Sequence, residues 1–412
     1  MLFPPPPVPV SPARVVVTGA GIVTALGTGW EANAAGFRAG RTAFRPVDLF
    51  DVSRQRARQA AQVDLPASLP PHRLRPHQAA RLDRAARMLL IAADEALRQS
   101  GWERDAFPWV LGTTACGMTL GEEFFRQARE HPEQRRHQAT RALVYQPQVQ
   151  GRYVADALGF GGPITIVSTA CASGADAIGQ AWELVRRGQA TRVLTGGYDA
   201  LCQLVFAGFD SLQALTPNVC RPFDARRDGL ALGEGAAILT LESLESATAR
   251  EAIILGEIVG YGTAIDLHHL TQPHPNGDAA LAAMQTACAV AGVEPAAIDY
   301  LNAHGTGTPL NDSAEAMAIQ RWAGARAESL PVSSTKASIG HLLGAAGSVE
   351  AVVCLMALAG QWLPPERTVE TPDPVCRFDL VREPRDAQPR LALSNSFGFG
   401  GANASLIFRR WA

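Results

Sequence analysis

The hydrophobic positions of this chain fall into two alternating kinds of segment. Short apolar runs rich in Val, Ile and Leu end at glycines or small residues, which is the pattern of buried strands. Between them, longer segments repeat apolar positions at helical spacing. The runs predicted as strands are 14–23, 109–114, 164–167, 192–197, 236–241, 253–260 and 300–301, and the predicted helices include 82–100, 176–185 and 279–291. This alternation predicts an α/β fold.

The order of these segments repeats along the chain. A helix that stops at Gly101 and a strand at 109–114 are echoed, 191 positions later, by a helix that stops at Gly292 and a strand at 300–301. The Ser-Thr-Ala-Cys turn at 168–171 is likewise echoed by Ser-Thr-Lys-Ala at 334–337. Two similar halves predict two mixed sheets with helices between and around them, so the two turns are expected to face each other. We expect a disordered proline-rich tail at 1–13 and two halves at 14–262 and 263–412.

Composition narrows the class of protein. The 412 residues are 47% hydrophobic and 18% charged, with a net charge of −2, which does not favour a nucleic-acid binder or a polybasic membrane protein. The seven cysteines are odd in number and form no Cys-x-x-Cys pair, so a reducing, cytoplasmic setting is expected. No apolar run is expected to span a membrane, and the first residues lack the features of a signal peptide.

A Gly-x-Gly sequence at 19–21 raises the question of a dinucleotide site. We read residues 14–23 as a strand followed by a glycine turn, and such turns can approach a pyrophosphate closely. The third glycine of that fingerprint is missing, and no acidic residue stands where the ribose contact would lie. The sequence therefore disfavours a nucleotide cofactor.

Cys171 is the candidate nucleophile, because it stands where a predicted strand turns into a helix. Unpaired N–H groups and the dipole at a helix N-terminus favour a thiolate over a thiol. Its neighbours Ala170, Ala172, Ser173 and Gly174 are all small, so a substrate can approach the sulfur. The alternative is that Cys171 packs as a small hydrophobic residue, as many free cysteines do.

The second half carries three further groups of residues that could do chemistry. His304 follows a strand in a loop of small residues, and Lys336 and His341 lie on the turn that matches the Cys171 turn. Phe399 stands among glycines in the segment 394–404, whose exposed N–H groups could bind an oxyanion and whose glycines allow movement. A lone histidine is more often structural, and a glycine-rich segment is often only a tight turn.

Four motifs resemble those of the β-ketoacyl-[acyl carrier protein] synthases, most closely the stand-alone elongating type of bacterial fatty acid and type II polyketide synthesis. They are Val-Ser-Thr-Ala-Cys-Ala-Ser-Gly at 167–174, Asn-Ala-His-Gly-Thr at 302–306, Ser-Ser-Thr-Lys with Gly-His at 333–341, and Ser-Asn-Ser-Phe-Gly-Phe-Gly-Gly at 394–401. The resemblance covers residues 14–409. It implies the duplicated thiolase fold, five α-β-α-β-α layers with two mixed sheets, which agrees with the internal repeat.

The resemblance also implies a reaction and its residues. Cys171 would hold the growing acyl chain as a thioester, and His304 and His341 would polarise the malonyl thioester carbonyl during decarboxylative condensation. Lys336 would shape the charge of the site and Glu350 would pair with it. The N–H groups of Cys171 and Phe399 would form the oxyanion hole, with Phe399 as a gate. No organic cofactor or catalytic metal is expected. Further substrate-binding or supporting positions are Gly400, Thr306, Thr308, Ala115 and Asn395, and the positions that match a structural monovalent cation in some relatives are Asn302, Ala303, Glu350, Ser394 and Asn395.

The expected partners follow from the same resemblance. An acidic acyl carrier protein would dock on a basic surface, for which Arg73, Arg75, Arg81 and Arg84 are candidates, although Ala80 and Gln213 stand where relatives are basic. A homodimer, or a heterodimer with a similar chain, is expected to pair through a strand at 192–196.

Departures from the family leave the pathway open. The sequence at 304–312 is His-Gly-Thr-Gly-Thr-Pro-Leu-Asn-Asp, where typical elongating enzymes have His-Gly-Thr-Ser-Thr-Pro-Leu-Gly-Asp, and the segment 215–221 is shorter than in fatty-acid enzymes. These features and residues 272–277 are similar to aryl-polyene and polyketide synthases. Ala115, in place of a branched residue, predicts a deeper acyl pocket, unless a partner side chain fills the space.

Two other classes remain as alternatives. A non-catalytic partner subunit of the chain-length-factor type would share the fold but lack the cysteine, and Cys171 is present. A thiolase-like degradative enzyme would use a second cysteine as its base, where this chain offers two histidines. Both alternatives are therefore weaker than a condensing enzyme.

Overall fold

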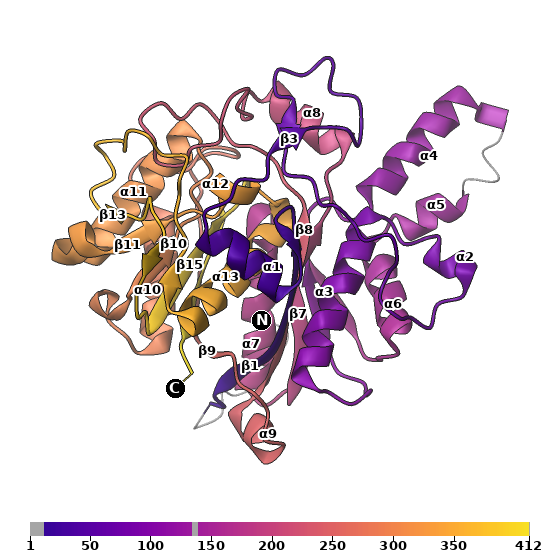
Figure 1. Ribbon diagram of the computed structural model, residues 1–412, viewed down its shortest axis with the longest axis horizontal. Helices are drawn as coiled ribbons and strands as arrows, with labels where there is room; N and C mark the ends of the chain where they lie inside the picture. The colour runs from indigo at the N-terminus through magenta and orange to yellow at the C-terminus, as the bar shows by residue number, and fades with distance from the viewer. Residues whose placement is uncertain (1–11, 134–138, 412) are drawn as a thin grey trace.

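The computed structural model describes residues 12–133 and 139–411 (Figure 1). Its frame is two sets of five strands with the same topology, called the first and the second sheet below, which hydrogen bonds join into one twelve-stranded sheet. Residues 1–11 of the expected proline-rich tail lie outside the described residues. The first sheet has the order β6-β5-β7-β8-β1, and the second has the order β11-β10-β15-β16-β9, with β13 added at its outer edge. The first-half strands are β1 (Val15–Thr24), β5 (Trp109–Gly112), β6 (Ile164–Val167), β7 (Arg192–Asp199) and β8 (Gly235–Ser243); the second-half strands are β9 (Gly256–Ile265), β10 (Tyr300–Asn302), β11 (Pro331–Ser333), β13 (Asp379–Leu380), β15 (Leu391–Phe397) and β16 (Ala402–Arg409).

The pairing confirms the internal repeat. From the outer edge inward, each sheet has two parallel pairs and then two antiparallel pairs: β6/β5/β7 followed by β7/β8/β1, and β11/β10/β15 followed by β15/β16/β9. The strands β6 and β11 therefore occupy equivalent places, and the cysteine turn and the lysine turn follow them. The two sheets meet where β1 pairs with β9 over three residues, so hydrogen bonding continues from one sheet to the other.

Helices form the inner and outer layers of the predicted five-layered arrangement. Helices α7 and α13 contact each other between the sheets, α3 covers β1 and β8, and α10 covers β9 and β16 (Figure 1). The main helices are α1 (Trp30–Arg38), α3 (Arg84–Ser100), α4 (Met118–Glu130), α5 (Ala139–Val144), α6 (Pro147–Leu158), α7 (Ser173–Arg186), α8 (Gln203–Ser211), α9 (Leu244–Ala249), α10 (Asp278–Ala291), α11 (Pro309–Ala323), α12 (Lys336–Ile339) and α13 (Ala346–Gly360). Gly101 and Gly292 end α3 and α10 in the left-handed conformation, as predicted.

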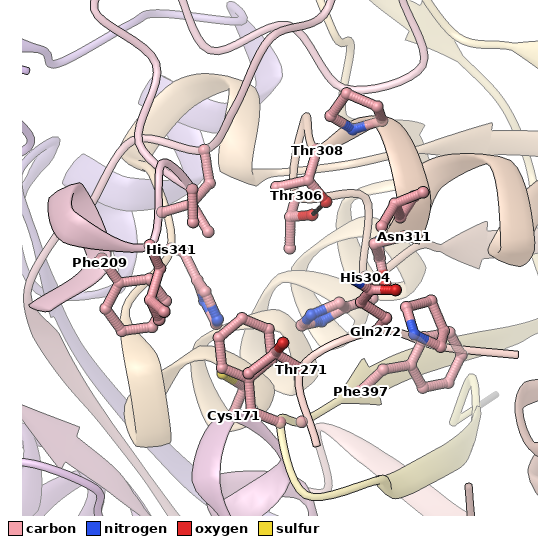
Figure 2. Close-up of a pocket in the computed structure, with 18 of the residues that line it drawn as sticks. Cys171, Phe209, Thr271, Gln272, His304, Thr306, Thr308, Asn311, His341 and Phe397 are labelled. Atoms are coloured by element: carbon pink, nitrogen blue, oxygen red, sulfur yellow. Dashed lines mark hydrogen bonds between the residues drawn. The ribbon is translucent and has the colours of Figure 1, made fainter. Parts of the chain in front are cut away.

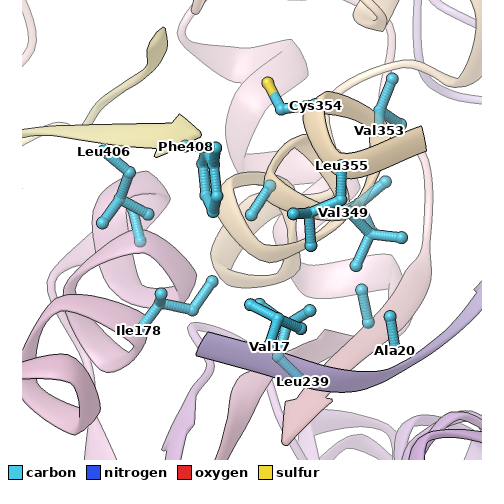
Figure 3. Packing of buried hydrophobic residues seen from close by; sticks show 14 of the residues in the cluster. Val17, Ala20, Ile178, Leu239, Val349, Val353, Cys354, Leu355, Leu406 and Phe408 are labelled. Carbon is cyan, nitrogen blue, oxygen red and sulfur yellow. The ribbon is translucent and has the colours of Figure 1, made fainter. Parts of the chain in front are cut away.

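The inner layer is packed tightly because small residues face each other across it. A Cβ on Gly174 of α7 would lie 2.7 Å from the Gly344 carbonyl oxygen, and one on Gly347 of α13 would lie 2.8 Å from the Ala175 nitrogen. Around this contact, apolar side chains from α7, α13 and both sheets form the main core (Figure 3). This close approach brings the start of α7, and with it the cysteine turn, against the segment before α13.

The glycines at 19–21 do not form the turn that we expected. Strand β1 runs through them without interruption, apart from a bulge between Val17 and Gly19. A Cβ on Gly21 would lie 1.9 Å from the Ala92 carbonyl oxygen, and one on Gly19 would lie 2.2 Å from the Ala96 carbonyl oxygen. The glycines therefore allow the backbone of α3 to pack directly on the strand, and the Gly-x-Gly sequence has a packing role.

The prediction that another chain pairs with the strand at 192–196 was also wrong. Strand β7 lies between β8 and β5, so both of its edges are already used. Within the described part of the chain, strand β6, which leads into the cysteine turn, pairs only with β5, so its other edge is open there. Only Val167 of β6 is buried, although we expected the whole strand to be. The first sheet therefore offers β6 for pairing with another chain.

One helix is longer and more apolar than we expected, because by length and composition alone it could cross a membrane. Residues Leu343–Gly360, which include α13, have a mean hydropathy of 1.8 over 18 residues. In the fold, 89% of that segment is buried between the two sheets. Packing on all sides explains its composition, because a helix buried all round needs no polar face.

Candidate active site

The Cys171 turn is a strained strand-to-helix connection. Ala170 has a φ of 50°, a conformation that costs free energy in a residue with a side chain. The Ser173 and Thr114 hydroxyls both donate to the Ala170 carbonyl oxygen, at 2.5 and 2.9 Å, and the Thr169 N–H donates to Ser173 Oγ at 2.9 Å. These bonds hold the turn so that Cys171 lies at the bottom of a cavity.

The resting Cys171 is a thiol, which corrects the expectation that the helix N-terminus favours a thiolate. Burial raises the pKa of its thiol from 9 to about 12. The Lys336 ammonium and the N–H of Phe399 act in the opposite direction but do not outweigh burial. Any reaction in which the Cys171 sulfur acts as a nucleophile therefore includes removal of the thiol proton.

His304 is positioned through its own backbone by a buried carboxyl group on α11. Glu315 accepts from the N–H groups of His304 and Gly305, each at 2.8 Å, and from the Asn395 amide at 3.2 Å. Burial raises the pKa of Glu315 to about 7, against these hydrogen bonds. The loop after β10 is thus fixed from below, and the imidazole extends into the cavity (Figure 2).

The two imidazoles lie edge to face, with ring centroids 5.3 Å apart. Burial, followed by the charge of Lys336, lowers the pKa of His304 and of His341 well below the ordinary value, so both rings are neutral at neutral pH. His304 Nδ1 and both ring nitrogens of His341 are buried and have no hydrogen-bond partner within the described part of the chain. Both rings point into the space above Cys171 (Figure 2). Unpartnered, neutral N–H donors aimed at one space can stabilise an oxyanion there.

Lys336 and Glu350 form an ion pair in which both side chains are buried. Lys336 begins α12 on the turn after β11, and Glu350 lies in α13. Burial raises the pKa of Glu350 to about 6, although the Lys336 ammonium lowers it. The pair brings a positive charge close enough to influence Cys171 and both histidines. Lys336 is the only lysine in the sequence.

The glycine-rich segment forms the connection between β15 and β16, beside Cys171. The Phe399 ring is 37% exposed and stacks on Phe209 of α8, with centroids 5.7 Å apart. The Phe399 N–H lowers the pKa of the Cys171 thiol, although burial outweighs it, so this donor faces the sulfur where an oxyanion would form. Gly400 and Gly401 have φ values of 82° and 85°, which favour glycine, and the Gly400 N–H donates to the Leu270 carbonyl oxygen at 2.7 Å.

The cavity above Cys171 has a volume of about 360 Å³. The predicted residues Cys171, His304, His341, Thr306 and Thr308 all line it (Figure 2). Phe399 lines it as well. The Thr306 and Thr308 hydroxyls lie 2.9 Å apart and face this space. Gly400 does not line the cavity, although Phe399 and Gly401 beside it do.

Ala115 lies outside the cavity in this structure. It is buried in a separate apolar cluster that includes Leu201, Phe206 and Leu343, and its N–H donates to Asp199 at 2.8 Å. Its role in acyl-chain length stays a prediction.

The residues proposed for a monovalent cation offer several free oxygens. Asn302 Oδ1, Ser394 Oγ and Glu350 Oε2 are buried without hydrogen-bond partners, and Asn302 pairs with Ser394 across β10 and β15. Oxygen ligands of this kind suit a hard cation. The Asn395 side chain is engaged elsewhere, since it donates to Glu315 and accepts from the Ser405 hydroxyl at 2.8 Å. Within the described residues no cluster of His, Cys, Asp and Glu that could hold a metal ion occurs.

Arg84 is not available as a docking residue. Its guanidinium binds the buried Glu234 carboxylate, with Nε 2.8 Å from Oε2, and also the Val63 carbonyl oxygen. Arg73 lines a different cavity from the one that holds Cys171. For Arg75 and Arg81, a role in docking stays a prediction.

Sequence reasoning missed Glu315 and Phe209. Glu315 lies three positions after Asp312, which accepts from the Thr306 and Gly307 N–H groups. Two acids at this spacing after a glycine-rich loop were the available signal, because such carboxyl groups can hold backbone N–H groups. Nothing in the sequence marked Phe209 as the stacking partner of Phe399.

Comparisons with known proteins agree with this geometry. Residues 13–247 match the family described as "Beta-ketoacyl synthase, N-terminal domain", and residues 255–370 match "Beta-ketoacyl synthase, C-terminal domain". The chain is 39% identical over 416 residues to a putative polyketide beta-ketoacyl synthase 1 of Streptomyces halstedii, covering 96% of this chain and 97% of that one. It is 37% identical over 418 residues to 3-oxoacyl-[acyl-carrier-protein] synthase 2 of Staphylococcus aureus, covering 97% and 98%.

A solved structure extends the comparison to an assembly. A type II polyketide ketosynthase in complex with its acyl-carrier protein superposes with a TM-score of 0.86 at 27% identity, covering 97% of this chain and 100% of that one. The family models match both halves of the chain, and the relatives match it over nearly their full length. The fold agrees, and this chain therefore belongs to the β-ketoacyl synthases.

Proposed function

We propose that this chain condenses an acyl group held on Cys171 with a malonyl unit held on an acyl carrier protein. The observation that supports this most directly is the convergence of one buried thiol and two neutral imidazoles on a single cavity. That set provides a nucleophile and two N–H donors without a general base of high pKa, which suits decarboxylation better than hydrolysis.

In the first half-reaction, the Cys171 sulfur attacks the carbonyl carbon of the acyl thioester. A new C–S bond forms, the bond to the carrier sulfur breaks, and the proton lost by Cys171 ends on the departing carrier thiol. The N–H groups of Cys171 and Phe399 stabilise the oxyanion that forms on the way. The Phe399 ring moves away from Phe209 when an acyl group on Cys171 occupies the space that the ring takes up.

In the second half-reaction, the malonyl group loses CO₂ and its carbonyl becomes an enolate. His304 and His341 donate hydrogen bonds to that enolate oxygen, for which their unpartnered ring nitrogens are free. The enolate carbon attacks the Cys171 thioester, so a C–C bond forms, the C–S bond breaks and Cys171 leaves as a thiolate. That thiolate takes up a proton from solvent to restore the resting thiol. Lys336 contributes by keeping both imidazoles neutral and Cys171 less basic.

The partners and the pathway are part of the proposal. That the partner is an acyl carrier protein is supported by the relative named 3-oxoacyl-[acyl-carrier-protein] synthase 2 and by the relative named as a polyketide synthase. Pairing with a second copy or a similar chain is supported by the open edge of β6. The relatives divide between fatty acid and polyketide synthesis, so the pathway stays open between them. A cytoplasmic location fits seven cysteines that are all free.

The test separates the two half-reactions. The chain is incubated with octanoyl-carrier protein and then with malonyl-carrier protein, and the intact masses of the enzyme and of the carrier-bound product are measured. Cys171→Ala should carry no acyl group, whereas His304→Ala and His341→Ala should acylate Cys171 and lose condensation by about 10²-fold or more. An acylated Cys171→Ala variant would contradict the nucleophile, and folded histidine variants that lose both steps equally would contradict the division of roles.

A further inference from the structure

Three exposed leucines surround the mouth of the Cys171 cavity. Leu212 follows α8 and is 58% exposed, Leu270 lies between β9 and α10 and is 72% exposed, and Leu310 is in the first turn of α11 and is 56% exposed. All three line the cavity that leads to Cys171. Single exposed leucines are common on protein surfaces, but apolar side chains from three separate elements around one opening mark an interaction site.

The charge around the opening is as informative as the leucines. The residues that line the cavity include Asp228 and Asp266 but no arginine or lysine. Asp228 accepts from the Thr216 hydroxyl and the Asn218 amide, and Asp266 accepts from the N–H groups of His268 and His274. An acidic partner would therefore find no arginine or lysine among the described residues that line this opening. What the lining offers to a large partner is three exposed leucines among neutral polar side chains, with two carboxylates already engaged.

The partner must cover this opening because of where the nucleophile lies. Cys171 is buried at the bottom of the cavity, so an acyl group attached to a macromolecule reaches the sulfur only when its attachment point is above the mouth. The surface around that attachment point then lies on Leu212, Leu270 and Leu310. Contact between apolar surfaces would remove the three leucines from water.

We propose that Leu212, Leu270 and Leu310 form an apolar rim that seats the acyl carrier protein through hydrophobic contact. This inference rests on the proposed condensing function and specifies how its partner is recognised. Affinity from this rim does not depend on ion pairs. The rim favours a substrate that is attached to the carrier protein, and it does not recognise the acyl group itself. Loss of one buried leucine contact should weaken binding by about ten-fold.

The experiment compares the same acyl group on two donors, octanoyl-carrier protein and octanoyl-pantetheine. Acylation of Cys171 is followed by intact mass, and the ratio of kcat/KM for the carrier donor to kcat/KM for the pantetheine donor is determined. The variants are Leu212→Ser, Leu270→Ser, Leu310→Ser and the triple variant. Ile253→Ser is the matched control, because Ile253 is 77% exposed and does not line the cavity.

The proposal expects the ratio to fall by about ten-fold in each single variant and further in the triple variant, and to stay at the wild-type value in Ile253→Ser. The fall should be the same at about 50 and about 500 mM NaCl, because salt screens ion pairs and not apolar contacts. Three results would each overturn the proposed role of the rim. They are a ratio for the triple variant within two-fold of wild type, an equal loss of kcat/KM with both donors, and a loss that disappears at high salt. Wild-type protein that takes an acyl group from neither donor would instead overturn the proposed function.

Discussion

Removing the ammonium of the buried Lys336–Glu350 pair gives a prediction whose size follows from the structure. Lys336→Met keeps a long side chain in the core but leaves the Glu350 carboxyl buried without its cation. Glu350 Oε2 has no hydrogen-bond partner among the described residues, and Ser396, the other side chain that lowers the pKa of Glu350, is neutral and cannot replace the lost positive charge. Breaking a buried pair by removing one partner typically costs about 3–5 kcal/mol. The free energy of unfolding should fall by about that amount.

The loss should depend on pH with a definite sign. Burial raises the pKa of Glu350 to about 6, and Lys336 is the first influence that lowers it. Without the ammonium this pKa rises further, so at acidic pH the carboxyl group is neutral and needs no cation. The destabilisation should therefore be largest above neutral pH and should shrink toward about pH 5. In Lys336→Met/Glu350→Leu both charges are gone, and stability should return to within about 1 kcal/mol of the native chain.

Urea unfolding of the three proteins at two pH values measures these differences, provided that the dependence on urea concentration is unchanged. Decarboxylation of malonyl-carrier protein gives a second readout. The charge of Lys336 lowers the pKa of His304 and His341, so Lys336→Met should move the acid limb of the rate profile to higher pH. A double variant as unstable as the single one, or a loss that does not change with pH, would refute an unpaired carboxylate as the cause.

Three further predictions concern the frame of the site. Burial raises the pKa of Glu315 to about 7, above its unfolded value, so this group favours folding at low pH and that contribution disappears as the pH rises toward 7. Urea unfolding between about pH 5 and 7 should show a steeper fall for the native chain than for Glu315→Gln, and equal slopes would contradict the assignment. In the same assay, Gly21→Ala should lower the free energy of unfolding by about 3 kcal/mol or more, because its Cβ would collide with the α3 backbone. Gly208→Ala is the control and should not be destabilised, because no atom lies within 4 Å of the added Cβ. Light scattering should give twice the chain mass, since β6 has an open edge, and a monomer at micromolar concentration would count against pairing there.

Much of the fold could be predicted because local signals and tertiary structure agree. The helix that ends at Gly101 and the one that ends at Gly292 needed only periodicity and a left-handed cap to be recognised. The repeat then placed the cysteine turn and the lysine turn at equivalent positions, which the matching strand order confirms. Cys171 and His341 could be predicted to lie near each other for that reason, whereas His304, which follows β10, was placed with them by the resemblance to the family.

The errors arose where the outcome depends on contacts between distant segments. Gly19 and Gly21 were read as a turn, because the sequence does not show that the α3 backbone rests on them. The edge of the first sheet was assigned to β7, because strand order follows from pairing that residue types do not encode. The pKa of Cys171 was expected to be low from its place at a helix start, but complete burial of the sulfur outweighs that effect.

The solitary lysine gives this protein an unusual chemical property. Lys336 is buried and is the one lysine in the sequence, so the permanent positive charges on the described surface are the guanidinium groups of arginines. Succinimidyl esters and other amine-directed reagents would find no lysine on the folded molecule. The one lysine they could modify, Lys336, is reached only when the active-site core opens, so labelling of the peptide that contains Lys336 would report that opening. Reversible lysine acetylation of the folded surface is excluded for the same reason, and arginine charge persists into strongly alkaline solution.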